Sequence, residues 1–296
     1  MIYWGITCSS HDGALAVYKD GEIVFASESE RFSRVKNDPE ISYKLIQHVE
    51  DAYGKPDKVF YYENPYIKAT RRWSVRQKPY LKKPNFPYKV KYSLHHESHA
   101  AYGYYTSPFD DCIVLVIDAI GEWDTLTVWK AKGKKLKKLW GWKYPKSLGL
   151  MYSALTQYSG WKPNEEEYIM MGAAARQIEP YEPAYKRIKN LWDEEVSWHK
   201  GCLNIDEWKR YPEIRPEDVP TAAQKVYDEV FNDILNKVTL MPENETNNLV
   251  FAGGCALNVS ANRQLSRFSN VYIPCNPGDS GSATVSYTHL TLPTKA

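Results

Sequence analysis

The stretch GALAVYKDGEIVFASES, residues 13–29, contains two apolar segments joined by Asp20 and Gly21. An Asp-Gly pair between two such segments is a strong short-range signal for a β-hairpin, because both turn positions need a residue that tolerates positive φ. The apolar segment IYWGIT, residues 2–7, predicts a further strand just before the hairpin. The chain is therefore predicted to open with three consecutive strands.

The same layout recurs later in the chain, in CIVLVIDA (112–119), TLTVWKAKG (125–133) and KLKKLWGW (135–142). In both units small or acidic residues follow the first strand. Two ordinary meanders would give this pattern, but two such units separated by helical sequence are also what a two-lobed fold of the actin and hexokinase kind is built from. We therefore predict an α/β fold, a duplicated ribonuclease-H-like ATPase type with mixed sheets flanked by helices. The predicted lobes are residues 1–105 and residues 106–284, the second with a helical insertion.

Helical periodicity predicts the other elements. We expect helices over residues 40–54, 147–160, 221–240 and 255–268, with Ser147 as an N-cap and Gly54 as a terminator. A strand, NLVFAGG, ends at Gly253 and Gly254, directly before the last of these helices. Backbone N–H groups at such a helix start form a ready anion site, although a lone Gly-Gly turn is often only a turn.

His95 and His99 lie four residues apart in LHHESHAA, residues 94–101, of a chain with only seven histidines. Two imidazoles at this spacing project from the same face of a helix. That arrangement suits a metal ion, which takes neutral imidazole nitrogen and needs one or two further ligands. The alternative is a pair of partly exposed histidines near a helix start.

Bulk properties narrow the class of protein. The 296 residues include 38 Lys and Arg against 36 Asp and Glu, so bulk charge does not indicate nucleic acid or a membrane surface as a partner. The five cysteines form no CxxC pair, which favours reduced thiols in a cytoplasmic protein. Neither a leader nor an apolar run of the ~20 residues that a membrane span needs is recognisable.

Two segments differ in composition or pattern from the rest of the chain. Residues 68–91 are basic, aromatic and proline-rich, and could bind a polyanion through their cations and stacking rings, although such segments are more often solvated surface loops. Residues 285–296 break the preceding pattern and are interpreted as a non-native tail.

Seven blocks resemble, in order, the carbamoyltransferase family typified by nodulation and antibiotic-tailoring O-carbamoyltransferases, whose N-terminal part is similar to the ATPase-like domain of tRNA threonylcarbamoylation. The ERFSRVK and HHESHA blocks are the most specific. The blocks are SSHDGALAVYKDGEIVFASESERFSRVKND (9–38), HHESHAAYGYYTSPFDD (95–111), VIDAIGEWDT (116–125), SLGLMYSALTQYSGW (147–161), NEEEYIMMGAA (164–174), FAGGCALNVSANRQL (251–265) and NPGDSGSA (276–283).

The resemblance implies a divalent metal, with iron suggested and zinc or manganese as alternatives, held by His95, His99, Asp118 and Asp279. Two imidazoles and two carboxylates form a mixed donor set that such ions accept, and they leave positions open for phosphate oxygens. The resemblance also implies a nucleotide, ATP or carbamoyl-adenylate, whose contacts we expect at Gly253, Gly254, Asn258 and Gly278.

The implied reaction is attack by the hydroxyl of a small-molecule, sugar or nucleoside acceptor on carbamoyl-adenylate, which is made from carbamoyl phosphate and ATP. His11 and Lys36 match family positions near the reacting group, so His11 is expected to orient the carbamoyl group or accept a proton and Lys36 to neutralise phosphate charge. Both also have ordinary interpretations, as a turn-capping side chain and a surface lysine.

Two departures from the family pattern favour other functions. Ile169 stands where the family usually has a lysine, and the family's C-terminal domain, which makes the carbamoyl-adenylate, is not recognisable in this sequence. A nucleotide-binding module that acts through a partner is therefore the alternative to an enzyme. A tRNA-modifying relative is a third possibility, disfavoured by the ERFSR and NEEEY blocks.

Overall fold

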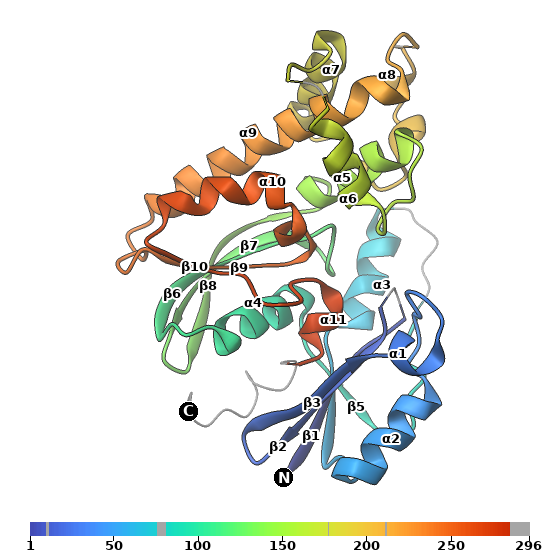
Figure 1. Ribbon diagram of the computed structural model, residues 1–296, viewed down its shortest axis with the longest axis vertical. Coiled ribbons are helices and arrows are strands. Elements are labelled where there is room, and N and C mark those ends of the chain that lie inside the picture. The colour runs from blue at the N-terminus through green and yellow to red at the C-terminus, as the bar shows by residue number, and fades with distance from the viewer. Residues whose placement is uncertain (10–11, 76–80, 177, 211, 285–296) are drawn as a thin grey trace.

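The computed structural model describes residues 1–9, 12–75, 81–176, 178–210 and 212–284. Within them lie two mixed sheets of five strands each, in the orders β3-β2-β1-β4-β5 and β10-β9-β6-β7-β8 (Figure 1). Each sheet pairs its first three strands antiparallel and adds the others parallel to the first. The strands are β1 (Ile2–Thr7), β2 (Ala14–Lys19), β3 (Glu22–Glu28), β4 (Lys58–Tyr61), β5 (Val90–Tyr92), β6 (Asp111–Ile117), β7 (Asp124–Lys132), β8 (Lys135–Lys143), β9 (Asn248–Ala252) and β10 (Asn270–Tyr272).

The predicted hairpin and the duplicated three-strand unit are confirmed. Asp20 and Gly21 have φ of 55° and 98°, the turn conformation that this dipeptide favours. In the second unit Gly133, with φ of 56°, makes the turn between β7 and β8. The two halves of the chain thus place their strands in the same order.

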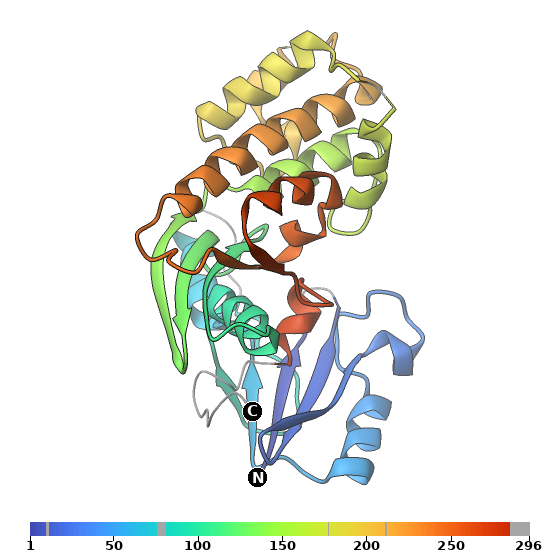
Figure 2. The same cartoon turned by 60° about the vertical axis from the view of Figure 1, so that its left-hand side comes forward.

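Eleven α-helices accompany the sheets in the described part of the chain. They are α1 (Glu30–Ser33), α2 (Tyr43–Tyr53), α3 (Pro65–Ser74), α4 (His95–Thr106), α5 (Leu148–Tyr158), α6 (Glu167–Ala174), α7 (Glu182–Asp193), α8 (Asp206–Lys209), α9 (Val219–Thr239), α10 (Val259–Asn262) and α11 (Asp279–Ser282). Figures 1 and 2 show α5 to α9 gathered at one end of the molecule and the first sheet at the other. Among the described residues no helix combines the length and the apolar character that crossing a bilayer requires.

Local signals explain where several helices begin. The hydroxyl of Ser147 accepts a hydrogen bond from Leu150 N at 3.0 Å, so the predicted N-cap of α5 is confirmed. The helix predicted from residue 40 begins instead at Tyr43, because Ser42 caps it by accepting from Lys44 N. In the basic segment 68–91, residues up to Ser74 belong to α3 and not to a loop, since Asn64 caps that helix.

The single helix predicted over residues 255–268 is wrong. The chain forms a 3-10 turn (Gly254–Leu257), the short α10 and a second 3-10 turn (Arg263–Arg267). The interruption falls at Asn258, whose side chain accepts from Ala261 N and thereby starts a new helix in place of continuing the first. Asn258 is consequently an N-cap and not a residue inside a helix.

Two short helices lie between the sheets. Helix α4 packs on β6, β7 and β9 of the second sheet, and α11 packs against α4 as well as against β1 and β2 of the first sheet. The lobe boundaries predicted at 105/106 and 284/285 stay predictions. What the packing establishes is that α4 lies against the second sheet and that α11 bridges it to the first.

Candidate functional site

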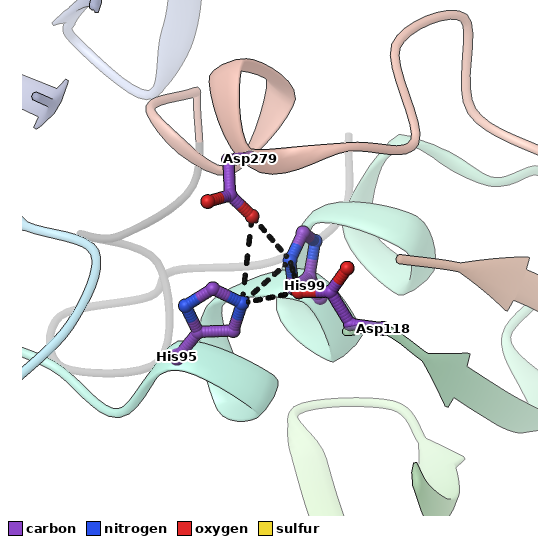
Figure 3. Close-up of side chains that lie close together, drawn as sticks. All are labelled: His95, His99, Asp118 and Asp279. Atoms are coloured by element: carbon purple, nitrogen blue, oxygen red, sulfur yellow. Dashed lines mark hydrogen bonds and ion pairs between the residues drawn. The ribbon is translucent and has the colours of Figure 1, made fainter. Parts of the chain in front are cut away.

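Four side chains from three separate parts of the chain meet at one point (Figure 3). His95 is the first residue of α4 and His99 follows one turn later, so both rings project from the same face. Asp118 comes directly after β6, and Asp279 is the first residue of α11. One ligand atom from each of the four lies within 4.8 Å of all the others.

The distances within this cluster are those of ligands around a common centre. Nε2 of His95 lies 2.8 Å from Oδ2 of Asp118 and 3.4 Å from Oδ1 of Asp279. Nε2 of His99 lies 3.1 Å from Nε2 of His95 and 3.2 Å from the same oxygen of Asp279. Two imidazole nitrogens that each bind one ion at about 2.0–2.1 Å stand about 2.8–3.4 Å apart when their angle at the ion is about 90–109°. The donor set therefore fits a divalent cation.

The outer atoms of three ligands, His99, Asp118 and Asp279, are held by hydrogen bonds as well. The hydroxyl of Ser282 lies 2.9 Å from Nδ1 of His99, and Gly254 N donates to Oδ1 of Asp118 at 3.2 Å. Tyr62 donates its hydroxyl hydrogen to Oδ2 of Asp279 at 3.2 Å. Outer contacts of this kind fix the orientation of ligand side chains in metal sites. They leave Nε2 of His99, Oδ2 of Asp118 and Oδ1 of Asp279 directed at the centre.

The charges of the cluster are mutually stabilised. Burial by itself would lower the pKa of His95, but the carboxylates of Asp279 and Asp118 outweigh it and raise that pKa to about 10. Burial would raise the pKa of Asp118, yet hydrogen bonds from His95 and His99 hold it well below its usual range. The facing Nε2 atoms of the two histidines cannot both donate toward each other. The cluster is thus an environment that favours a cation at its centre.

A cavity of about 610 Å³ opens beside the cluster, with Asp118 and Asp279 in its wall. Its size is in the range of small-molecule sites. The other predicted site residues that line it are Lys36, Gly254, Asn258 and Gly278. Lys36 is exposed at its edge, and His11 lies outside the described residues. Ile169 lies in α6 and is not among the lining residues, whereas its neighbour Tyr168 is.

The Gly-Gly turn differs from the expected anion site. Gly253 does not line the cavity; its N–H donates to Pro277 O at 2.9 Å, and its φ of 90° makes the turn. A Cβ there would lie 2.3 Å from Ile117 O, so the glycine allows a close approach of two backbones. Gly254 N is bonded to Asp118. Both N–H groups thus have partners within the protein, and their contact with phosphate stays a prediction.

Several supporting residues escaped the sequence analysis. Ser282 follows Asp279 by three residues, and this helical spacing in DSGSA could have indicated a shared face. Asn276 and Ser280 both donate to Oε1 of Glu28 at 3.1 Å, which ties the loop of Asp279 to β3 of the first sheet. No local signal connects residues so far apart in sequence.

Asn258 is held by a distant partner that the sequence also did not reveal. Its side-chain amide exchanges hydrogen bonds of 3.2 and 3.3 Å with that of Gln224 on α9. Gln224 in turn accepts from the hydroxyl of Tyr152 at 2.8 Å, and Tyr152 also lines the cavity. This polar group fixes one wall of the cavity.

Solved structures of low sequence identity share this fold. Component A of (R)-2-hydroxyglutaryl-CoA dehydratase from Acidaminococcus fermentans matches with a TM-score of 0.55 at 12% identity, covering 98% of this chain and 100% of that one. The activator of 2-hydroxyisocaproyl-CoA dehydratase from Clostridium difficile, solved with bound ADPNP, matches with a TM-score of 0.54 at 11% identity, covering 98% and 94%. The predicted two-lobed actin/hexokinase-like fold class is confirmed.

Sequence relatives are more informative about the family. An uncharacterised protein of Synechocystis sp. is 32% identical, over 94% of this chain and 55% of its own length. The nodulation protein NolNO of Sinorhizobium fredii is 23% identical, over 92% of this chain and 45% of its own length. The chain spans about half the length of these curated relatives.

The family model described as the carbamoyltransferase N-terminus matches residues 58–286, which include all four residues of the cluster. That match covers more than half of the chain, and six of the seven sequence blocks lie within it, all but residues 9–38. The chain belongs to the carbamoyltransferase N-terminal family.

Proposed function

We propose that this chain carries the transfer site of an ATP-dependent O-carbamoyltransferase. The observation that supports it most is the cluster of His95, His99, Asp118 and Asp279, in a chain of this family. Two of the four residues, Asp118 and Asp279, line a cavity of about 610 Å³. The donor is carbamoyl-adenylate, formed from carbamoyl phosphate and ATP. The acceptor is a hydroxyl group of a small molecule, a sugar or a nucleoside.

The four residues of the cluster hold a divalent metal in this proposal, iron first, with zinc or manganese as alternatives. When bound, the ion supplies Lewis-acid stabilisation to phosphate oxygens of the nucleotide. The Lys36 ammonium at the edge of the cavity adds positive charge on the same ligand. Asn258 and Gly278 form part of the wall against which the nucleotide lies.

In the proposed transfer step one bond to the carbamoyl carbon forms and another breaks. The acceptor oxygen bonds to the carbamoyl carbon, the bond from that carbon to the phosphate oxygen breaks, and AMP leaves with the electron pair. His11 takes the hydroxyl proton of the acceptor as a general base.

A nucleotide-binding module without turnover is the second candidate. One observation favours it: Ile169 stands where the family usually has a lysine, so a phosphate contact made by that lysine is lost. Release of AMP from carbamoyl-adenylate, measured with and without a panel of hydroxyl acceptors, separates the two functions. Release that depends on an acceptor supports the enzyme, and binding without release supports the module.

The first test is metal analysis of the purified chain with ADP, for the wild type and for His99→Ala. We expect near-stoichiometric metal in the wild type and its loss in the variant, because His99 supplies one of four ligands. His48→Ala, which removes an exposed imidazole on α2, is the matched control and retains the metal. A well-folded wild type without metal, in the presence of iron, zinc or manganese, would contradict the metal site and leave the module as the function.

A further inference from the structure

The buried carboxylate of Glu122 lies at the junction of three segments that surround the cluster. It belongs to the turn between β6 and β7, four residues after Asp118, and only 6% of Glu122 is exposed. Oε1 and Oε2 each lie 3.2 Å from the backbone N of His95, and Oε1 accepts from Asn64 N at 2.6 Å. One side chain thus connects α4, the β6–β7 turn and the segment that begins α3.

This carboxylate takes the place of an N-cap on α4. The residue at the N-cap position is Leu94, which has no side-chain oxygen to accept from the first N–H groups of the helix. A negative charge at this end is also favoured by the helix dipole. The helix that carries both histidines therefore begins at an oxygen pair supplied by another segment.

Gly121 reinforces the same contact. A Cβ at this position would lie 3.0 Å from Cβ of His95 and 3.1 Å from Cγ and Cδ2 of its ring, so the turn is packed directly against the imidazole. The neighbouring bond from Gly121 N to Asp124 O, at 2.9 Å, keeps the turn closed. Backbone and ring of His95 are thus both located by the turn that follows Asp118.

We propose that Glu122 is a positioning residue that fixes His95 relative to Asp118 and so presets the metal cluster. The inference rests on the metal site of the proposed function. Glu122 does not supply a ligand atom to the cluster; it sets the separation of two ligands that belong to different elements. Supporting contacts of this kind typically change metal affinity by about 10–100-fold.

The test compares Glu122→Gln with the wild type by titration with Co²⁺ alone, followed by the visible absorption of the bound ion. The variant keeps the shape of the side chain but loses its charge and one accepting oxygen. We expect Co²⁺ affinity to fall about 10–100-fold and the absorption bands to shift, because the spectrum reports ligand geometry and not merely the fraction of folded protein.

Asp218→Asn is the matched control. Asp218 is also 6% exposed and accepts a backbone N–H, that of Arg215 at 3.1 Å, just before α9. Its neutralisation is expected to lower thermal stability while leaving Co²⁺ affinity and spectrum as in the wild type. If it weakens binding as much as Glu122→Gln does, the effect is one of general stability and the inference fails.

Gly121→Ala is a second variant that tests the same contact if Glu122→Gln does not fold. The φ of Gly121 does not lie in the left-handed region, so the substitution adds only a Cβ, which would contact His95 closely. We expect weaker Co²⁺ binding with a shifted spectrum. Wild-type affinity and spectrum in every folded variant would overturn the positioning role alone, whereas a wild type that does not bind Co²⁺ would remove the metal site as well.

Discussion

The orientation of His99 depends on one hydroxyl group. Ser282 Oγ lies 2.9 Å from Nδ1 of the ring, and both side chains are buried. Because this contact engages Nδ1, it holds the ring with Nε2 facing the centre of the cluster.

Ser282→Ala is therefore expected to weaken metal binding about tenfold, the lower end for a lost outer contact. The measurement is competition with a chelator of known affinity. Ser107→Ala is the comparison, since Ser107 is also buried and donates to a backbone oxygen, Tyr104 O, at the far end of α4. Equal affinity in Ser282→Ala and the wild type would show that the ring is oriented by packing alone.

The sequence was enough to pair the two histidines, because their spacing of four residues is a property of the helix itself. It was not enough to place Asp118 and Asp279 beside them. These residues are 161 positions apart, and only the family resemblance connected them. The outer contacts of Ser282, Tyr62 and Glu122 also arise from the folded arrangement and have no local pattern.

Helices and strands, like the site residues, are predictable from the sequence where neighbouring residues decide them. The Asp20-Gly21 hairpin and the start of α5 were predicted correctly because the residues that decide them lie within a few positions of each other. At Asn258 the side chain caps a new helix through Ala261 N and breaks the helical pattern, and the pairing with Gln224 on α9 that holds this amide lies outside any local window. Tertiary partners override a helical pattern in this way.

The cap of α5 provides a test at this level. Ser147 Oγ accepts from Leu150 N and donates to Ala119 O at 2.6 Å, and its side chain is buried. Ser147→Ala leaves both partners without that bond, so we expect the free energy of unfolding to fall by about 1–2 kcal/mol.

Denaturant titration measures this loss, with Ser42→Ala as the comparison. Ser42 caps α2 through a longer bond of 3.3 Å at an exposed site, so its removal is expected to cost less. An equal loss in the two variants would contradict the contribution assigned to burial.

The ligands of the cluster are distant in sequence and meet only in the folded chain, so a metal ion should stabilise the entire fold. An unfolded chain cannot offer the four donors together. Saturation at about 100 times the dissociation constant is expected to add about 2.7 kcal/mol to the free energy of unfolding. Thermal unfolding with and without Mn²⁺ measures it, and an equal gain in His99→Ala would place the binding elsewhere.

The position of α11 has a mechanical consequence. Asp279 begins a helix that lies against both β1 and β2 of the first sheet and α4 on the second, whereas His95, His99 and Asp118 all belong to the second. A hinge motion between the two halves would therefore stretch or compress the coordination sphere on one side. An ion bound by all four ligands would oppose such a motion, because it would join Asp279 to residues of the second sheet.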